Sequence, residues 1–223
     1  MIYNYKYDGG TWQDVDDYIP YLEVNATPYV SRDLFKSHQP YQCDVPPCRH
    51  ILSGQAPTQC RCPNCAFQFE RVIYLIRDAR PTLLSYWNFT QNLGLCNTSF
   101  QTFLGERRYP GVSWSDHIRS WMSAPVDILF VKYEDMVADA PRELRRVLRF
   151  LRWHINETLV RRAVAYSARE NMSRVEVRHG NGYDRYGDFR FIGPGGARHD
   201  YDEAFYREHG YMLERWGYRN TLN

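Results

Sequence analysis

The chain has 223 residues, of which 43% are hydrophobic and 16% aromatic, and its formal net charge is +2. This length supports one α/β domain with its own core and is too short for two comfortable ones. The small net charge excludes the strong field of a typical nucleic-acid-binding protein, so we expect no nucleic acid partner. The sequence contains no apolar run long enough to span a membrane, and residues 1–10 do not form a signal peptide.

The first predicted strand is short, covers residues 34–38 and stops before Pro40. A cysteine-rich segment at 41–70 follows, and because it lacks helical or strand periodicity we predict an exposed insertion loop. Cys62-x-x-Cys65 has the spacing of half a zinc site, whereas an oxidising compartment would favour disulfides. Under both interpretations the cysteines staple the loop and are not catalytic. The zinc alternative uses Cys48, Cys60, Cys62 and Cys65.

The segment from Arg71 to Ser85 is the most informative part of the chain. Residues 71–76 form a continuous apolar run typical of a parallel strand covered on both faces, and the following residues to about Asn92 are predicted to be helical. Arg77 follows the strand directly, and Ser85 lies on the first turns of the helix. Proteins hold phosphates with such a combination of a fixed cation, a helix start and a hydroxyl group. The segment therefore predicts a phosphate-binding site.

The remaining chain continues to alternate between helices and strands. Residues 126–131 read as a second buried strand, and Asp139 and Pro141 open a helix whose apolar residues recur at helical spacing up to residue 151. Strands that alternate with helices predict a parallel sheet with right-handed crossovers, flanked by helices, in a single domain spanning 1–223. Further helices are predicted at 113–122, 159–168 and 204–216, and a loop at 180–196. Trp114 and Trp121, both within 113–122, are expected to belong to the core.

Two motifs resemble the P-loop sulfotransferases that use 3′-phosphoadenosine 5′-phosphosulfate (PAPS). The string VIYLIRDARPTLLSYWNF resembles the segment that binds the 3′-phosphate of PAPS in this family, which implies this role for Arg77 and Ser85. Lys36-Ser-His38-Gln-Pro40 resembles the Lys-Thr-His-x-Pro element of the cytosolic type. This likeness implies that His38 is the general base for the acceptor, a task that suits a histidine. It also implies that Lys36 neutralises charge on the sulfuryl group.

The same resemblance implies three further cofactor-binding residues. Tyr133 begins a Tyr-Glu-Asp motif whose tyrosine lies beside adenine in the family, although it could equally be a half-buried structural tyrosine. Ser167 falls where relatives have a hydroxyl near the base, but Arg169 stands in place of the usual aromatic residue. Gly195 belongs to a loop similar to the one over the 3′-phosphate. There Gly193-Pro194 replaces the family's Arg-Lys pair, so glycine N–H groups would have to contribute.

The family's phosphosulfate-binding loop, similar to Tyr-Pro-Lys-Ser-Gly-Thr-Thr-Trp, has no counterpart in the sequence as given. We therefore expect an N-terminally incomplete α/β domain of P-loop type that lacks the first strand and this loop. Without the loop we expect little or no sulfuryl transfer from this sequence, because positioning and charge neutralisation supply most of the catalysis in such transfers. The leading hypothesis is transfer of a sulfuryl group from PAPS to a hydroxyl or amine of a carbohydrate, protein or small alcohol, without a metal. The alternative is a non-catalytic relative that binds nucleotide or a protein partner. A P-loop kinase is disfavoured because the sequence has no Walker motif.

Asn-x-Ser/Thr sequons point to a cellular compartment. The composition gives about one by chance, whereas five occur. The excess predicts a glycoprotein of the Golgi lumen, where the cysteines would form disulfides, and the cytoplasm is the alternative. The sequons begin at Asn25, Asn88, Asn97, Asn156 and Asn171.

Overall fold

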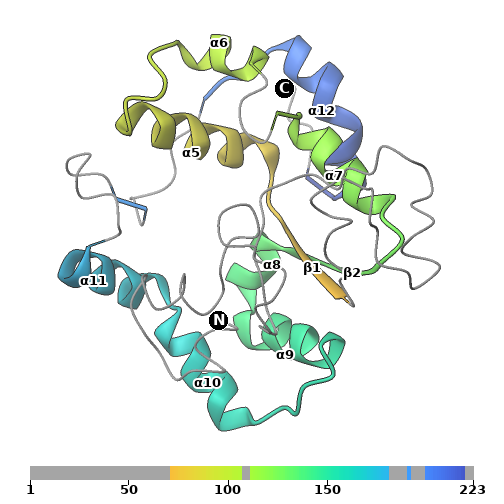
Figure 1. Ribbon diagram of the computed structural model, residues 1–223, viewed down its shortest axis with the longest axis vertical. Helices are drawn as coiled ribbons and strands as arrows, with labels where there is room; N and C mark the ends of the chain where they lie inside the picture. Colours follow the sequence, from red (N-terminus) through yellow and green to blue (C-terminus); the bar gives the residue numbers. More distant parts are fainter. Residues whose placement is uncertain (1–70, 107–110, 181–189, 192–198, 219–223) are drawn as a thin grey trace, which may run out of the picture.

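The computed structural model describes residues 71–106, 111–180, 190–191 and 199–218. At its centre lie two strands, β1 (Arg71–Ile76) and β2 (Asp127–Lys132), which run parallel (Figure 1). The pairing runs from Arg71 opposite Asp127 to Ile76 opposite Lys132. The strands predicted at 71–76 and 126–131 and their parallel arrangement are therefore confirmed. The strand predicted at 34–38 and the insertion loop at 41–70 lie outside the described residues.

The apolar run of β1 predicted a strand covered on both faces, and this is wrong for one of its residues. Ile76 is 1% exposed, but the neighbouring Leu75 is 54% exposed. Successive side chains of a strand point to opposite faces, so one face of β1 is open at this position. A continuous apolar run predicts a strand, but it does not determine whether other elements cover both faces of that strand.

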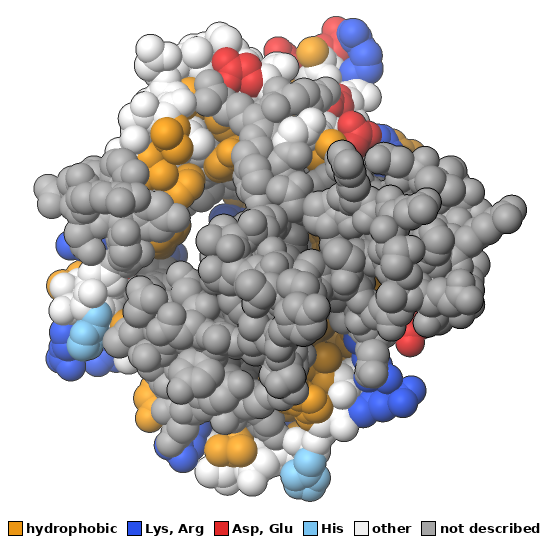
Figure 2. Space-filling view, viewed as in Figure 1, with side chains coloured by type: hydrophobic (Ala, Val, Ile, Leu, Met, Phe, Trp, Pro, Cys, Tyr) orange, Lys and Arg blue, Asp and Glu red, His pale blue; other side chains and the backbone are white. Residues whose placement is uncertain are grey.

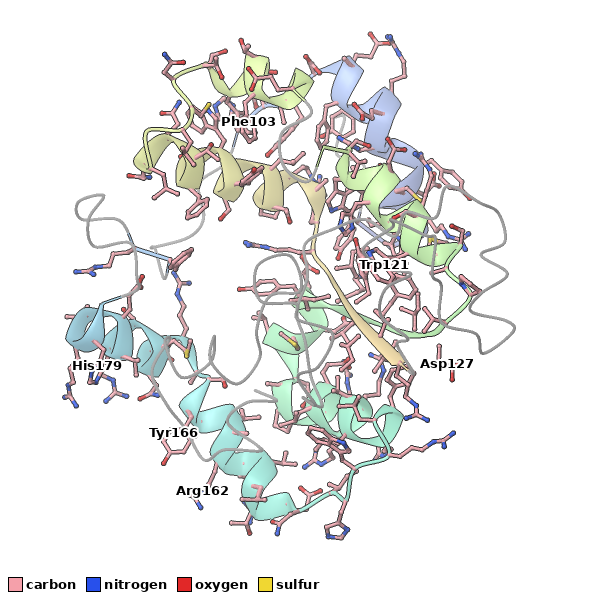
Figure 3. The ribbon with its side chains drawn as sticks, in the orientation of Figure 1. Phe103, Trp121, Asp127, Arg162, Tyr166 and His179 are labelled. Carbon is pink, nitrogen blue, oxygen red and sulfur yellow. The ribbon has the colours of Figure 1, made fainter. Side chains whose placement is uncertain are left out.

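One group of helices packs on one side of the strands. It contains three helices that follow β1 and the final helix of the described chain. It consists of α5 (Ala79–Asn92), α6 (Phe100–Gly105), α7 (Trp114–Met122) and α12 (Glu203–Arg215), which lie together in Figure 1. Figure 3 shows Trp121 on the side of α7 that faces the strands, and its ring centroid lies 6.5 Å from that of Tyr74. The tryptophan predicted as core is thus buried. The main core cluster comprises Ile76, Ala79, Ile118, Phe205, Met212, Leu213 and Tyr218.

A second group of helices lies on the other side of the strand pair (Figure 1). It comprises α8 (Tyr133–Ala138), α9 (Ala140–Phe150), α10 (Glu157–Tyr166) and α11 (Arg169–His179). As predicted, Asp139 caps α9, and its side chain accepts the Arg142 N–H at 3.0 Å. The helices α6, α8 and α11 were not predicted. The first two have six residues each, too few to reveal a helical period, and α11 carries few apolar residues.

Positive charge is concentrated in this second group of helices. Residues 140–180 contain ten arginines and four glutamates. Two of those glutamates, Glu143 and Glu176, are buried and add little negative charge to the surface. In the space-filling view the lower half, around α9 to α11, shows several patches of Lys and Arg and little Asp or Glu (Figure 2). The small net charge of the whole chain therefore conceals a local positive field.

Candidate functional site

The end of β1 and the start of α8 bring together two residues predicted to bind the cofactor. Arg77 directly follows β1, and Tyr133 directly follows β2. Because Ile76 and Lys132 are paired in register, the next residue of each chain segment lies at the same edge of the sheet. The guanidinium carbon of Arg77 lies 4.6 Å from the centroid of the Tyr133 ring. Ligands of α/β proteins collect at this carboxyl edge of parallel strands.

The start of α5 is already occupied by a carboxylate. Asp78 is its N-cap residue, and one carboxylate oxygen accepts the Arg80 N–H at 2.9 Å. The same carboxylate forms an ion pair with the Arg80 guanidinium, which raises the pKa of that guanidinium. Thr82 donates its hydroxyl to the Asp78 carbonyl at 2.7 Å. The helix start therefore carries its own negative charge, which disfavours a second anion at the N-terminus of α5.

Ser85 lies on α5 with its side chain exposed. Phe89 is one helical turn further along the same face. Its ring stacks on that of Phe191 with a centroid distance of 5.6 Å. The backbone N–H of Phe191 donates to the buried carboxylate of Glu176 at 2.6 Å, which fixes this short segment against α11. The segment that leads toward Gly195 is thus anchored over the helix face that carries Ser85, although Gly195 itself lies outside the described residues.

Ser167 lies at a different junction, where α10 ends and α11 begins. Its backbone N–H donates to the Ala163 carbonyl at 3.1 Å, and its side chain is half-buried. Arg169, which stands in place of an aromatic residue, is the first residue of α11 and is exposed. The structure therefore brings together Arg77 and Tyr133, whereas Ser167 and Arg169 belong to the α10–α11 turn.

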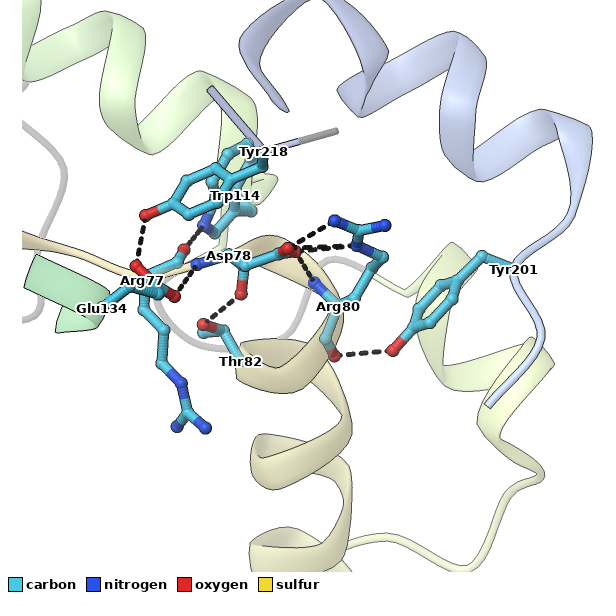
Figure 4. Close-up of polar contacts among 8 residues, drawn as sticks. All are labelled: Arg77, Asp78, Arg80, Thr82, Trp114, Glu134, Tyr201 and Tyr218. Carbon is cyan, nitrogen blue, oxygen red and sulfur yellow. Dashed lines mark hydrogen bonds and ion pairs between the residues drawn. The ribbon is translucent and has the colours of Figure 1, made fainter. Parts of the chain in front are cut away.

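Three residues around Arg77 were not predicted as part of the site (Figure 4). Glu134 accepts the backbone N–H of Asp78 at 3.2 Å with one oxygen, and the hydroxyl of Tyr218 at 2.9 Å with the other. The indole N–H of Trp114 donates to the Arg77 carbonyl at 3.0 Å. Burial, and then the hydrogen bond to Glu134, raise the pKa of Tyr218, so its phenol stays protonated and donates. Figure 4 shows the Arg77 side chain pointing away from this cluster.

Several predicted site residues lie outside the described part of the chain. They are Lys36, His38, Gly195, and the zinc-alternative residues Cys48, Cys60, Cys62 and Cys65. Within the described ranges, no group of three or more His, Cys, Asp or Glu side chains could hold a metal ion. None of the helices in those ranges is both long and apolar enough to cross a membrane.

Comparison with known sequences identifies a family. The model of the sulfotransferase domain matches residues 11–188. Rat sulfotransferase 1C2 is 27% identical over 194 residues, which cover 77% of this chain and 64% of the relative. Rabbit amine sulfotransferase is 29% identical over 174 residues, which cover 73% of this chain and 52% of the relative. The chain therefore spans about two thirds or less of the length of these relatives.

Comparison with solved structures supports the fold that the sequence predicts. Retinol dehydratase in complex with androsterone and the inactive cofactor PAP superposes with a TM-score of 0.59 at 20% identity, covering 91% of this chain and 57% of that one. A mouse sulfotransferase, SULT7A1, in complex with PAP gives 0.50 at 21% identity, covering 68% and 59%. These neighbours support the α/β fold of P-loop type that was expected. The family match, which covers residues 11–188, shows that the chain belongs to the sulfotransferase domain family.

Proposed function

We propose that this protein binds PAPS and transfers its sulfuryl group to a hydroxyl or amine of an acceptor. The contact between Arg77 and Tyr133 at the carboxyl edge of the parallel strands carries this proposal. An arginine can hold a phosphate with two parallel hydrogen bonds, and an aromatic ring beside it can pack against a purine base. Both features of the ligand, a phosphate and a base, would be recognised at one place.

The chemistry of the Arg77 side chain supports its assignment as a phosphate ligand. Among the described residues, its guanidinium has no carboxylate partner, and its contact there is the ring of Tyr133. A guanidinium of this kind retains its hydrogen-bond donors for an anion. Ser85 would add a hydroxyl donor from an exposed position on α5. The positive field of α9 to α11 favours the approach of a ligand with several phosphate charges.

The transfer step depends on residues outside the described part of the chain. PAPS, when bound, supplies a sulfuryl group on a good leaving group, adenosine 3′,5′-bisphosphate (PAP). We propose that His38 accepts the proton of the acceptor hydroxyl or amine as that group attacks the sulfur. Lys36 neutralises charge on the sulfuryl group during the transfer. No metal takes part in this scheme.

We propose a small alcohol, phenol or amine as the acceptor, in preference to a carbohydrate or a protein. The support comes from the names of the relatives. One is an amine sulfotransferase from rabbit, and another is a flavonol 4′-sulfotransferase from Flaveria chlorifolia. The retinol dehydratase neighbour was solved with androsterone, which is also a small molecule.

Calorimetric titration with PAP tests the binding half of the proposal. We expect the wild-type chain to bind, and Arg77→Ala to raise Kd by about tenfold or more through the loss of charge-assisted hydrogen bonds. Arg161→Ala is a matched control because Arg161 is an exposed arginine on α10, away from β1. Absence of binding by the wild-type chain would refute the proposal. Equal affinity of Arg77→Ala and the control for PAP would show that Arg77 does not contribute to the binding site.

A transfer assay separates the enzyme from the non-catalytic alternative. Labelled PAPS would be offered with a small phenol and a small amine, and the sulfated product measured. We expect His38→Ala to bind PAP as the wild type does and to lose transfer. A wild-type chain that binds PAP and transfers nothing to either acceptor, both by itself and when extended by any coding sequence upstream of it, would favour the binding protein.

The cellular compartment is a separate proposal, and here we favour the cytoplasm over the Golgi lumen. One of the sequon asparagines uses its amide nitrogen, the atom that would carry a glycan, in a hydrogen bond of the fold. The Asn171 amide donates to the Tyr166 carbonyl at 2.8 Å, and a glycan on that nitrogen would compete with this bond. Expression in mammalian cells followed by glycosidase digestion tests this proposal, since a shift in mobility would restore the luminal one.

A further inference from the structure

A single peptide group beside the proposed phosphate ligand is held from both ends. Its carbonyl, which belongs to Arg77, accepts the indole N–H of Trp114 at 3.0 Å. Its N–H, which belongs to Asp78, donates to Glu134 at 3.2 Å. The orientation of this peptide plane sets the direction in which the Arg77 side chain leaves the backbone. The two hydrogen bonds therefore fix the backbone from which the Arg77 side chain extends.

Tyr218 contacts both of these partners. Its hydroxyl donates to the second oxygen of Glu134 at 2.9 Å, and its ring meets that of Trp114 edge to face at 6.5 Å. The ammonium of Lys132, the last residue of β2, lies 4.6 Å from the centroid of the Tyr218 ring. Tyr218 is 6% exposed, so it is fixed by its surroundings. It therefore joins the ends of both strands to the last helix of the described chain.

The backbone explains how a residue so far along the sequence reaches the site. Gly217 has a φ of +72°, the left-handed conformation that ends many helices. The N–H of Tyr218 donates back to the Leu213 carbonyl at 2.8 Å, and that of Gly217 to the Glu214 carbonyl at 2.9 Å. This turn ends α12, and the Tyr218 hydroxyl reaches Glu134. The Trp-Gly-Tyr sequence at 216–218 thus ends the helix and allows the tyrosine to contact Glu134.

We propose that Tyr218 is a positioning residue for the cofactor site and acts through Arg77. It holds Glu134 and Trp114 in the arrangement that orients the Arg77 peptide. This arrangement helps to keep the guanidinium over the Tyr133 ring, where its hydrogen-bond donors can bind a phosphate. The proposal rests on the proposed function, because it assigns the phosphate to Arg77. Tyr218 itself touches no ligand in this scheme.

Calorimetric titration of the full chain with PAP tests this role. Tyr218→Phe removes the hydroxyl and keeps the ring, so we expect Kd to rise about fivefold, the effect of one lost hydrogen bond. Glu134→Gln, which retains a polar group of the same size, should weaken binding by a similar factor. Tyr211→Phe is the control, since Tyr211 lies on α12 and is 65% exposed. We expect its Kd to equal that of the wild type.

A double-mutant cycle distinguishes positioning from a general loss of structure. If Tyr218 acts through Arg77, the Tyr218→Phe change has no further effect on Kd in an Arg77→Ala background. Equal fivefold effects in both backgrounds would overturn the proposal, as would a Tyr218→Phe protein that binds PAP like the wild type. In both cases the wild-type protein binds PAP, and the proposed function stands. A wild-type protein that does not bind PAP refutes the proposed function, and this inference with it.

Discussion

A buried ion pair between two residues of α9 provides a test of how this fold is stabilised. Glu143 is 2% exposed and forms ion pairs with Arg146 and, at 3.1 Å, with Arg142. The second guanidinium nitrogen of Arg146 donates to the Phe130 carbonyl of β2 at 2.7 Å. Arg146 therefore neutralises a buried carboxylate and also fastens α9 to the sheet. We predict that Arg146→Met destabilises the protein substantially.

The magnitude follows from the burial of Glu143. Removing one partner of a buried ion pair costs about 3–5 kcal/mol when the remaining charge is left uncompensated. Here Arg142 remains nearby with a side chain that is 59% exposed, and Arg146 is itself 41% exposed, so solvent reduces the effect. We expect the free energy of unfolding to fall by about 2 kcal/mol. In urea this loss lowers the midpoint by about 1 M for an m-value of about 2 kcal/mol/M.

Urea unfolding followed by far-UV circular dichroism measures this change, and α9 offers a matched control. Arg145→Met removes the ion pair with Glu157 at 2.8 Å, which lies at the surface, so we expect the midpoint to stay nearly constant. The double variant Arg146→Met with Glu143→Leu removes the buried charge and should recover much of the loss. If Arg145→Met and Arg146→Met lower the midpoint equally, the reasoning from the buried carboxylate is refuted.

Three further predictions concern single residues. Arg152 has a φ of +59° directly after α9, so Arg152→Gly should relieve backbone strain and raise stability by about 0.5 kcal/mol, seen as a higher Tm. Burial raises the pKa of Tyr74 above its ordinary 10.0, so its contribution to stability is complete below pH 10 and is lost as the pH rises further. Tyr74→Phe should therefore show a shallower alkaline loss in unfolding titrations. Gly217→Ala and Gly94→Ala both place a side chain at positive φ and should each cost about 1 kcal/mol, but only the former should weaken PAP binding in calorimetry.

The sequence was a good guide wherever a local rule determined the structure. The apolar run at 71–76 predicted β1, and the Asp-x-Pro signal at Asp139 predicted the start of α9. The approach of Arg77 to Tyr133 depends on the pairing and register of the two strands, which the structure supplies, because each residue directly follows its strand. Such reasoning places residues at a shared edge of the sheet even when more than fifty positions separate them in the sequence.

The supporting residues of the site could not be predicted by these rules. Glu134 binds a backbone N–H of another segment, and a contact of this kind leaves no periodic pattern or motif. Trp114 was expected to be core, which is consistent with its packing but omits its hydrogen bond to the Arg77 carbonyl. For Tyr218 a local signal did exist, since a glycine after a helical run predicts a helix end. That signal identifies the turn, and only the tertiary structure shows what the tyrosine meets.

The link between the end of α12 and the strand edge has a consequence for dynamics. If Tyr218 helps to orient the phosphate ligand, then a bound phosphate must in turn stabilise the position of Tyr218, because coupling between two sites is reciprocal. The Tyr218 N–H, bonded to the Leu213 carbonyl at 2.8 Å, reports on this turn. We predict that PAP slows hydrogen exchange of that N–H in the wild-type protein and has less effect in Tyr218→Phe. If PAP protects the amides around Arg77 but leaves the α12 turn unchanged, the two regions are not coupled, and the turn has a purely structural role.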